Sequence, residues 1–262
     1  MTLIIGVLCQ DGVVVASDSA ATFGTDTAFT IGQQPVQKVT LVNDHILYAS
    51  TGAVGLSQIV ADRLRQLWEG KALSGLPTPE AAMDRLGKEI GAFVEPYLRT
   101  AQMQRQLVGS ASSSLCKSLV ALPVSHKPCL FQFDYNGAPE RATPQLPFVA
   151  LGSGQPIADP FLAFLRRLFW SNHEPTLAEG RFAAVWTIDH VRRTNPGGVG
   201  GNIQLATLEP VPGKPAAAKV ATPDEVQEHL QKVEQAEAAL QAHVRGAATE
   251  AAPPPTTAGE AE

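Results

Sequence analysis

The second residue of the chain, Thr2, has the side chain and the position that an N-terminal nucleophile requires. If Met1 is removed, the Thr2 hydroxyl and the free α-amine share one Cα, so the nucleophile carries its own base. An α-amine titrates near ~8, close to the value at which a general base works best at neutral pH. A threonine can equally stand here simply as the second codon, so the interpretation depends on the residues that follow.

Two short runs rich in β-branched residues, 3–9 and 13–22, follow Thr2 and are joined at Asp11-Gly12. This pattern predicts a tight β-hairpin. Neither run alternates with polar residues, so we expect both faces of the hairpin to be covered by other layers. Asp18 lies at the far end of the second strand, and antiparallel pairing brings that end back beside the chain start. The hairpin therefore predicts a carboxylate next to Thr2.

A third run, residues 36–42, leads through a short polar turn into a fourth run, residues 45–52, and predicts a second hairpin. Lys38 lies near the open end of this hairpin, the end to which Gly52 returns. Taken alone, Lys38 fits a solvated lysine at a strand end. Gly52 alone fits a strand terminator before a helix that begins near Val54. Neither residue identifies a site by itself.

Taken together, these features resemble the proteasome β-subunit and HslV superfamily of N-terminal nucleophile hydrolases. The resemblance covers roughly residues 2 to 208 and rests on the Asp-Gly hairpin, the segment ASDSAAT, a Lys-Val pair after a loop, and the segment HILYASTGAVG. It implies that Thr2 is the nucleophile and that Gly52 donates to the oxyanion. It also implies that Asp18 and Lys38 form an acid–lysine pair. The most similar subgroup is the betaproteobacterial proteasome homologue, with Anbu and HslV more distant.

Two further segments bear on the resemblance. Ala150-Leu151-Gly152-Ser153-Gly154, followed by an apolar helix, resembles the Gly-Ser-Gly turn of the family and implies that Ser153 lies beside the α-amine. Proteasome subunits also carry an Asp and a Ser shortly before a Gly-Gly pair, whereas Gly200-Gly201 here follow Asn195-Pro196-Gly197-Gly198-Val199. Neither the acid nor the hydroxyl is present. Asn195 or backbone carbonyls of this glycine-rich loop are the candidates to replace them.

The resemblance also implies a substrate and an assembly. Substrate would lie extended near Thr22 and residues 50–54, with Ser50 and Val54 shaping the pocket for the side chain that precedes the cut. We expect a threonine-type endopeptidase that hydrolyses peptides or unfolded proteins inside stacked homo-oligomeric rings, fed by an unidentified ATPase or adaptor. Two alternatives stay open: an amidase or acylase of small amides on the same fold, and a non-catalytic ring subunit like the proteasome α-subunits.

Composition narrows the classes of function. With 262 residues and 44% hydrophobic content the chain can bury one substantial core, and its net charge of −5 gives no reason to expect nucleic acid. No apolar stretch approaches the ~18 residues of a membrane span and no signal peptide precedes Thr2, so we expect a cytoplasmic protein without a membrane partner. The 3 cysteines are unclustered and favour buried reduced thiols. No residue pattern indicates a metal or a cofactor.

The order of the predicted elements indicates the fold class. After the two hairpins we expect helices over 54–69 and 79–98, strands over 115–124 and 129–135, helices over 156–170 and 177–192, and a late strand over 201–208. Strands, two helices, strands, two helices and a strand predict an α+β fold with two sheets between two helical layers. The resemblance implies the same arrangement, the four-layer αββα sandwich of the N-terminal nucleophile hydrolase type.

The composition changes after the predicted hydrolase domain, residues 1–209. Residues 210–221 are rich in Pro and Gly and are expected to be a linker. The capping box Thr222-Pro223-Asp224-Glu225 follows this linker and predicts an accessory helix over 222–246. The apolar residues of this helix form a heptad-like seam interrupted by Glu237, which fits either a surface helix leaning on its own domain or a contact with a neighbouring subunit. The tail, residues 247–262, is expected to be disordered.

Overall fold

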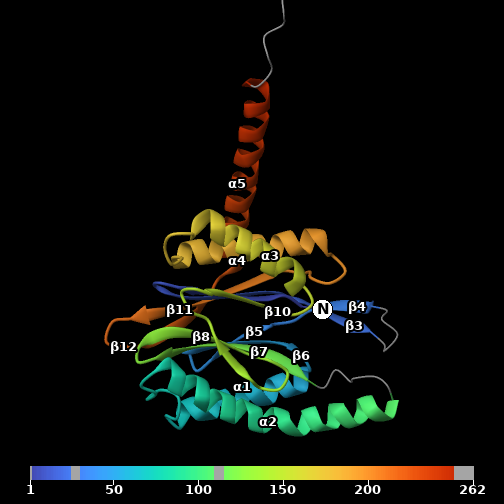
Figure 1. Ribbon diagram of the computed structural model, residues 1–262, viewed down its shortest axis with the longest axis vertical. Helices are drawn as coiled ribbons and strands as arrows, with labels where there is room; N and C mark the ends of the chain where they lie inside the picture. The colour runs from blue at the N-terminus through green and yellow to red at the C-terminus, as the bar shows by residue number, and fades with distance from the viewer. Residues whose placement is uncertain (1, 25–29, 109–114, 251–262) are drawn as a thin grey trace, which may run out of the picture.

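A computed structural model describes residues 2–24, 30–108 and 115–250, which form a mixed α+β fold (Figure 1). Two five-stranded antiparallel sheets face each other, in the strand orders β10-β1-β2-β11-β12 and β5-β6-β7-β8-β9. The first sheet consists of β1 (Ile4–Cys9), β2 (Gly12–Asp18), β10 (Phe148–Leu151), β11 (Ile203–Val211) and β12 (Lys214–Val220). The second consists of β5 (Val39–Val42), β6 (Ile46–Gly52), β7 (Cys116–Val124), β8 (Lys127–Phe133) and β9 (Pro139–Arg141).

Helices cover the outward faces of the two sheets (Figure 1). They are α1 (Val54–Glu69) and α2 (Pro79–Val108) on the second sheet, and α3 (Gln155–Phe169) and α4 (Leu177–Thr194) on the first. The predicted helices agree with these bounds to within two residues, except that α2 continues through Pro96 to Val108. Within the described residues, no helix is long and apolar enough to cross a membrane.

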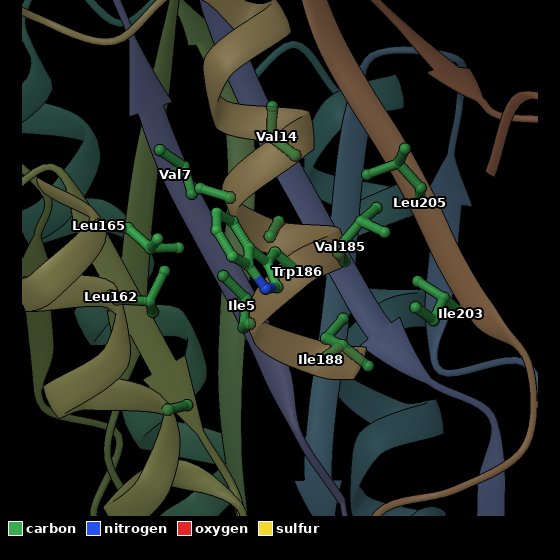
Figure 2. Packing of buried hydrophobic residues seen from close by; sticks show 14 of the residues in the cluster. Ile5, Val7, Val14, Leu162, Leu165, Val185, Trp186, Ile188, Ile203 and Leu205 are labelled. Atoms are coloured by element: carbon green, nitrogen blue, oxygen red, sulfur yellow. The ribbon is translucent and has the colours of Figure 1, made fainter. Parts of the chain in front are cut away.

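Three clusters of buried hydrophobic residues hold these layers together. In the first cluster, Trp186 of α4 packs among side chains from α3 and from strands β1, β2 and β11 (Figure 2). A second cluster joins α1 and α2 to the second sheet, and a third fills the space between the sheets. Strand β1 contributes Ile5 and Val7 to the first cluster and Ile4 to the third. Both of its faces are therefore buried, as the absence of alternation in its sequence predicts.

Both predicted hairpins are present. Strands β1 and β2 pair with Ile4 opposite Ser17, which brings the end of β2 back to the start of the chain. Strands β5 and β6 pair with Val39 opposite Ala49. Residues 36–38 were expected to open this second hairpin, but they lie outside any strand and lead from β4 (Thr30–Pro35) into β5. Strand β4 pairs with β3 (Ala20–Gly24) in a two-stranded ribbon that the sequence interpretation did not contain.

The expected linker over 210–221 is wrong. Strand β11 continues to Val211, turns at Gly213, and pairs with β12, which is the outer strand of the first sheet. Ala216 of β12 is fully buried in the cluster between the sheets. Pro215 is tolerated because an edge strand needs ladder hydrogen bonds on one side only. The sheet domain therefore extends to Val220 rather than ending at residue 209.

The last helix, α5 (Pro223–Glu250), starts at the predicted capping box and has two different halves. In its first half Val226 and Val233 are buried in the cluster around α4, so this half leans on its own domain. Glu237 does not merely interrupt the seam, because its carboxylate accepts a hydrogen bond of 2.9 Å from Trp186 Nε1. Beyond it, α5 projects past the layer of α3 and α4 (Figure 1), and Leu240 there is 54% exposed.

Candidate active site

Thr2 lies two residues before the start of β1, at the end of that strand where Ile4 pairs with Leu151 of β10. The turn after β10 holds its backbone: Gly154 N donates to Thr2 O at 3.2 Å. Thr2 N donates to Ser153 Oγ at 3.1 Å. With Met1 attached, Thr2 N is a peptide N–H, and it stands for the α-amine that removal of Met1 would create. The structure thus places Ser153 beside the atom to which the resemblance assigned it.

Gly152 in the same turn is required by its close approach to Thr2. Its φ is +103°, and a Cβ built there would lie 2.1 Å from Thr2 O. Any other residue would therefore push the turn away from the start of the chain. We assigned no role to Gly152 from the sequence, although the Gly-Ser-Gly pattern contained it.

Asp18 ends β2 and is almost fully buried, with 1% of its surface exposed. Its Oδ1 accepts hydrogen bonds from Leu3 N at 2.9 Å and from Lys38 Nζ at 2.7 Å. Its Oδ2 accepts from Ala20 N at 3.3 Å and from Gly200 N at 3.2 Å. A buried carboxylate needs donors to replace the water it has lost, and these four contacts provide them.

Lys38 joins this carboxylate to Thr2. Its Nζ donates to Asp18 Oδ1 at 2.7 Å and to Thr2 Oγ1 at 3.1 Å, and only 6% of its side chain is exposed. Burial lowers the pKa of Lys38 below its ordinary value, and the charge and hydrogen bond of Asp18 oppose that shift. Lys38 is therefore not a solvated lysine at a strand end. Its ammonium lies where a positive charge would stabilise an alkoxide on Thr2.

The glycine-rich loop before β11 reaches the site through its backbone. Gly200 N donates to Asp18 Oδ2, and Gly200 O accepts hydrogen bonds from Ser19 N at 3.2 Å and Ala20 N at 3.0 Å. Of the two replacements considered for the missing Asp and Ser, the loop backbone is the one that contacts the carboxylate. It does so with an N–H group, and its carbonyl binds the residues that follow Asp18.

Two more residues of this region escaped the sequence interpretation. Ser19 Oγ accepts a hydrogen bond from Asn202 N at 2.8 Å. Gly201 has a φ of +72°, and a Cβ there would lie 2.4 Å from Ser19 Oγ. Asn195 was the other candidate to replace the missing Asp and Ser. Its backbone carbonyl accepts a hydrogen bond from Gly198 N, within the glycine-rich loop itself. The available signals were the second serine of the segment ASDSAAT and the second glycine of the Gly-Gly pair.

Gly52 ends β6 with a φ of +114°, and a Cβ there would lie 2.2 Å from Leu115 O. Glycine is thus required at this position by the backbone. Because Val39 pairs with Ala49, the end of β6 runs past the segment that carries Lys38. Gly52 therefore lies at the same end of the second sheet as Lys38, and its role as an oxyanion donor stays a prediction.

The three residues expected to bind substrate lie on different elements. Ser50 is on β6, and its hydroxyl forms a short hydrogen bond with that of Ser57 on α1. Val54 is the first residue of α1 and is 71% exposed. Thr22 is on β3, where its backbone pairs with Gln33 of β4, and its side chain lies outside the described part of the chain. Ser57 was not anticipated as a neighbour of Ser50.

The geometry thus brings together a hydroxyl, an ammonium and a buried carboxylate within hydrogen-bond distance. Ser153 adds a second hydroxyl at Thr2 N. Such a set can activate a hydroxyl nucleophile, given a base next to it. In the described residues, no group of three or more His, Cys, Asp or Glu side chains could hold a metal ion.

A family model and several curated relatives each match part of the chain. Residues 2–74 match the family model for the proteasome subunit. Proteasome subunit alpha of Methanococcus maripaludis strain C5, and that of strain C7, are each 28% identical over 163 residues, which are 60% of this chain and 53% of the relative. The chain spans about half the length of the curated relatives it matches.

Solved structures match over almost the whole chain. The helical assembly of the Anbu complex from Pseudomonas aeruginosa has a TM-score of 0.66 at 19% identity and covers 97% of this chain and 98% of its own. Anbu (ancestral beta-subunit) from Yersinia bercovieri has a TM-score of 0.66 at 16% identity, over 98% and 100%. At such identities the likeness shows the fold alone. Together these findings show a proteasome-like N-terminal segment and an overall fold like that of Anbu, whereas membership of the N-terminal nucleophile superfamily and closeness to the betaproteobacterial subgroup stay predictions.

Proposed function

We propose that this chain is the subunit of a threonine-type peptidase in which Thr2, after removal of Met1, is the N-terminal nucleophile. One observation carries the proposal: Lys38 Nζ lies 3.1 Å from Thr2 Oγ1 and 2.7 Å from Asp18 Oδ1. Fold stability alone gives little reason for this arrangement. A buried ion pair is expensive to desolvate, and apolar residues of similar volume often stabilise a protein as well or better.

In the proposed mechanism, Thr2 Oγ1 attacks the carbonyl carbon of a peptide bond, and the Thr2 α-amine accepts the hydroxyl proton directly or through a water. Lys38, held by Asp18, stabilises the negative charge that develops on the oxygen. Ser153 orients the amine. Gly52 N–H donates to the oxyanion, and one such donor is typically worth ~3 kcal/mol of barrier. The amine then gives its proton to the leaving group, and water hydrolyses the acyl ester.

Substrate specificity would follow from the strands next to Thr2. An extended peptide would add its backbone beside β3, near Thr22, and beside the end of β6. Ser50 and Val54 would contact the side chain that precedes the cut. The exposure of Val54, at 71%, supports this role because its side chain is available to a ligand.

The assembly we propose is a homo-oligomeric stacked ring of αββα subunits in the cytoplasm, with the Thr2 sites facing an inner chamber and an ATPase or adaptor supplying unfolded protein. An open threonine peptidase would damage other proteins, so restricted access is expected. The Anbu complex of Pseudomonas aeruginosa is described as a helical assembly, and a helix is therefore the competing arrangement. Light scattering at micromolar concentration measures the mass, and electron microscopy distinguishes a ring from a helix. A monomer would contradict the chamber.

The test of the chemistry begins with the intact mass of the purified protein, which shows whether Met1 has been removed. Thr2→Ala should then abolish hydrolysis of fluorogenic peptides while the protein stays folded and assembled. Thr194→Ala, which alters a threonine that hydrogen-bonds within α4, is the matched control and should keep full turnover. Retention of Met1, or equal turnover by Thr2→Ala and the parent, would contradict the proposal.

Two alternatives have support of their own. The glycine-rich loop in place of the family's Asp and Ser favours an amidase or acylase that acts on small amides. A panel of fluorogenic peptides and small acyl-amides, read against Thr2→Ala, separates that activity from a peptidase. The curated relatives carry the name proteasome subunit alpha, which favours a non-catalytic ring subunit. Turnover that depends on Thr2 against any amide would exclude it.

A further inference from the structure

Gln204 on β11 makes contacts that link the two halves of the candidate site. It pairs with Ser17 of β2, and the preceding residue, Ile203, pairs with Asp18. Gln204 therefore belongs to the strand next to the one that carries the buried carboxylate. The sequence interpretation contained a strand here but assigned no role to this side chain.

The Gln204 side chain binds the backbone of the segment that leads into β5. Its Oε1 accepts hydrogen bonds from Lys38 N at 2.8 Å and from Val39 N at 3.1 Å, and its Nε2 donates to Val36 O at 2.6 Å. An acceptor facing two N–H groups and a donor facing a carbonyl fix the orientation of the amide. These contacts matter because residues 36–38 lie outside any strand, so hydrogen bonds other than those of a sheet must hold their backbone; Val36 N, for example, donates to Ser19 O at 2.8 Å.

The two members of the ion pair lie at the ends of strands from different sheets. Asp18 ends β2 of the first sheet, whereas Lys38 directly precedes β5 of the second. Their relative position therefore depends on what joins the sheets at this edge. Gln204 belongs to the first sheet, and its side chain accepts a hydrogen bond from the backbone N–H of Lys38 itself. We infer that Gln204 is a positioning residue that holds Lys38 in place between Asp18 and Thr2.

A hollow of about 710 Å³ lies against this contact. Gln204 and Val39 line one side of it, and Val226, Gln227 and Leu230 of α5 line another. The space allows a substituted side chain at position 204 to be accommodated without forcing the sheets apart. Gln204→Met keeps the side-chain length and loses all three hydrogen bonds, so it separates the contacts from the volume.

The inference rests on the proposed function for its kinetic test. Gln204→Met should lower kcat about 10- to 100-fold with little change in KM, because a misplacement of about 1 Å in a catalytic group has effects of this size. Gln227→Met changes an exposed glutamine of the same hollow and should leave kcat unchanged.

A second measurement does not need activity. Competitive acetylation of lysines, read by mass spectrometry, reports how accessible and reactive each amine is. In Gln204→Met, Lys38 should react several-fold faster relative to Lys117 than in the parent, whereas in Gln227→Met the ratio should stay unchanged. If Gln204→Met retains the parental kcat and the parental Lys38 reactivity, the positioning role is overturned. If the parent has no turnover that depends on Thr2, the proposed function fails, and the acetylation ratio still decides the role of Gln204.

Discussion

Two of the lysine–aspartate ion pairs in this molecule have similar lengths and very different surroundings. Lys38 Nζ lies 2.7 Å from Asp18, and Lys117 Nζ lies 2.9 Å from Asp134. In the first pair 6% of the lysine and 1% of the aspartate side chain are exposed, against 27% and 57% in the second. The N–O distance therefore does not distinguish a candidate catalytic pair from a surface pair. The exposed fractions of the side chains do distinguish them.

The partners of the two lysines differ as well. Lys38 also donates to the Thr2 hydroxyl, whereas Lys117 Nζ lies over the ring of Tyr135, 4.9 Å from its centroid. The hydroxyl can become a nucleophile and the ring cannot. A buried pair leaves an uncompensated charge when one member is removed, whereas an exposed pair leaves a charge that water can solvate. The same substitution in the two pairs should therefore have unequal results.

The largest difference is expected from removal of the lysines. Lys38→Ala should reduce turnover by orders of magnitude and cost about 3 kcal/mol of unfolding free energy, because Asp18 stays buried without its cation. Lys117→Ala should keep turnover and cost less than about 1 kcal/mol. Urea unfolding and peptide hydrolysis measure the two effects. Equal stability losses in the two variants would contradict the distinction by burial.

The stability part of this expectation comes from the structure and not from the sequence. A lysine shortly before a β-branched run reads as solvated, and no local pattern shows that Asp18 and Thr2 remove it from water. Asp18 itself was predictable, because a tight hairpin fixes by local geometry which strand end returns to the chain start. Lys38 and Ser153 were placed only by resemblance, since they reach Thr2 from distant parts of the chain.

The parts of the fold that could not be predicted depend on long-range pairing. Strand β12, the run Lys-Pro-Ala-Ala-Ala-Lys-Val, has low strand propensity and becomes a strand because β11 offers it an edge. The ribbon of β3 and β4 likewise forms between two segments of weak pattern. Gln204 gave no signal at all, because a glutamine on a strand acquires its role only when residues 36–39 fold against it.

A smaller difference is expected when the carboxylates are replaced by amides of the same shape. Asp18→Asn removes the charge and the strong acceptor that raise the pKa of Lys38, so burial should lower that pKa further. The cost in stability should be about 2 kcal/mol, because the NH2 group of the asparagine replaces an accepting oxygen and now faces another N–H donor. Asp134→Asn should cost less than about 0.5 kcal/mol.

Acetylation of lysines as a function of pH measures the pKa of Lys38 directly, and urea unfolding measures both stabilities. In Asp18→Asn the midpoint of Lys38 reactivity should move to lower pH than in the parent. In Asp134→Asn it should not move. A midpoint that rises in Asp18→Asn would mean that the amide variant admits water to the lysine and that burial is not the dominant cause.

The smallest effect is a difference in pH dependence. The folded protein binds the Lys38 proton less tightly than the unfolded chain, whose lysines titrate at about 10.5. Between the folded pKa and that value the unfolded state holds more protons, so stability rises with pH. The unfolding free energy of the parent minus that of Lys38→Met should therefore increase toward pH 10.5. The raised pKa values of Tyr48 and Cys116 act in the opposite direction, but they cancel in this difference.

The surface pair supplies the control with the opposite sign. The hydrogen bond from Lys117 lowers the pKa of Asp134 below its ordinary value of 3.8, so this contribution is present above that pH and is lost as the pH falls through the folded pKa. The unfolding free energy of the parent minus that of Lys117→Met should not change with pH at high pH and should decrease only in acid. Because Asp134 is largely exposed, salt should weaken this acid limb, whereas the alkaline limb of Lys38 should persist in 1 M salt, where screening acts over about 3 Å. A salt-sensitive alkaline limb would show that water reaches Lys38 in solution.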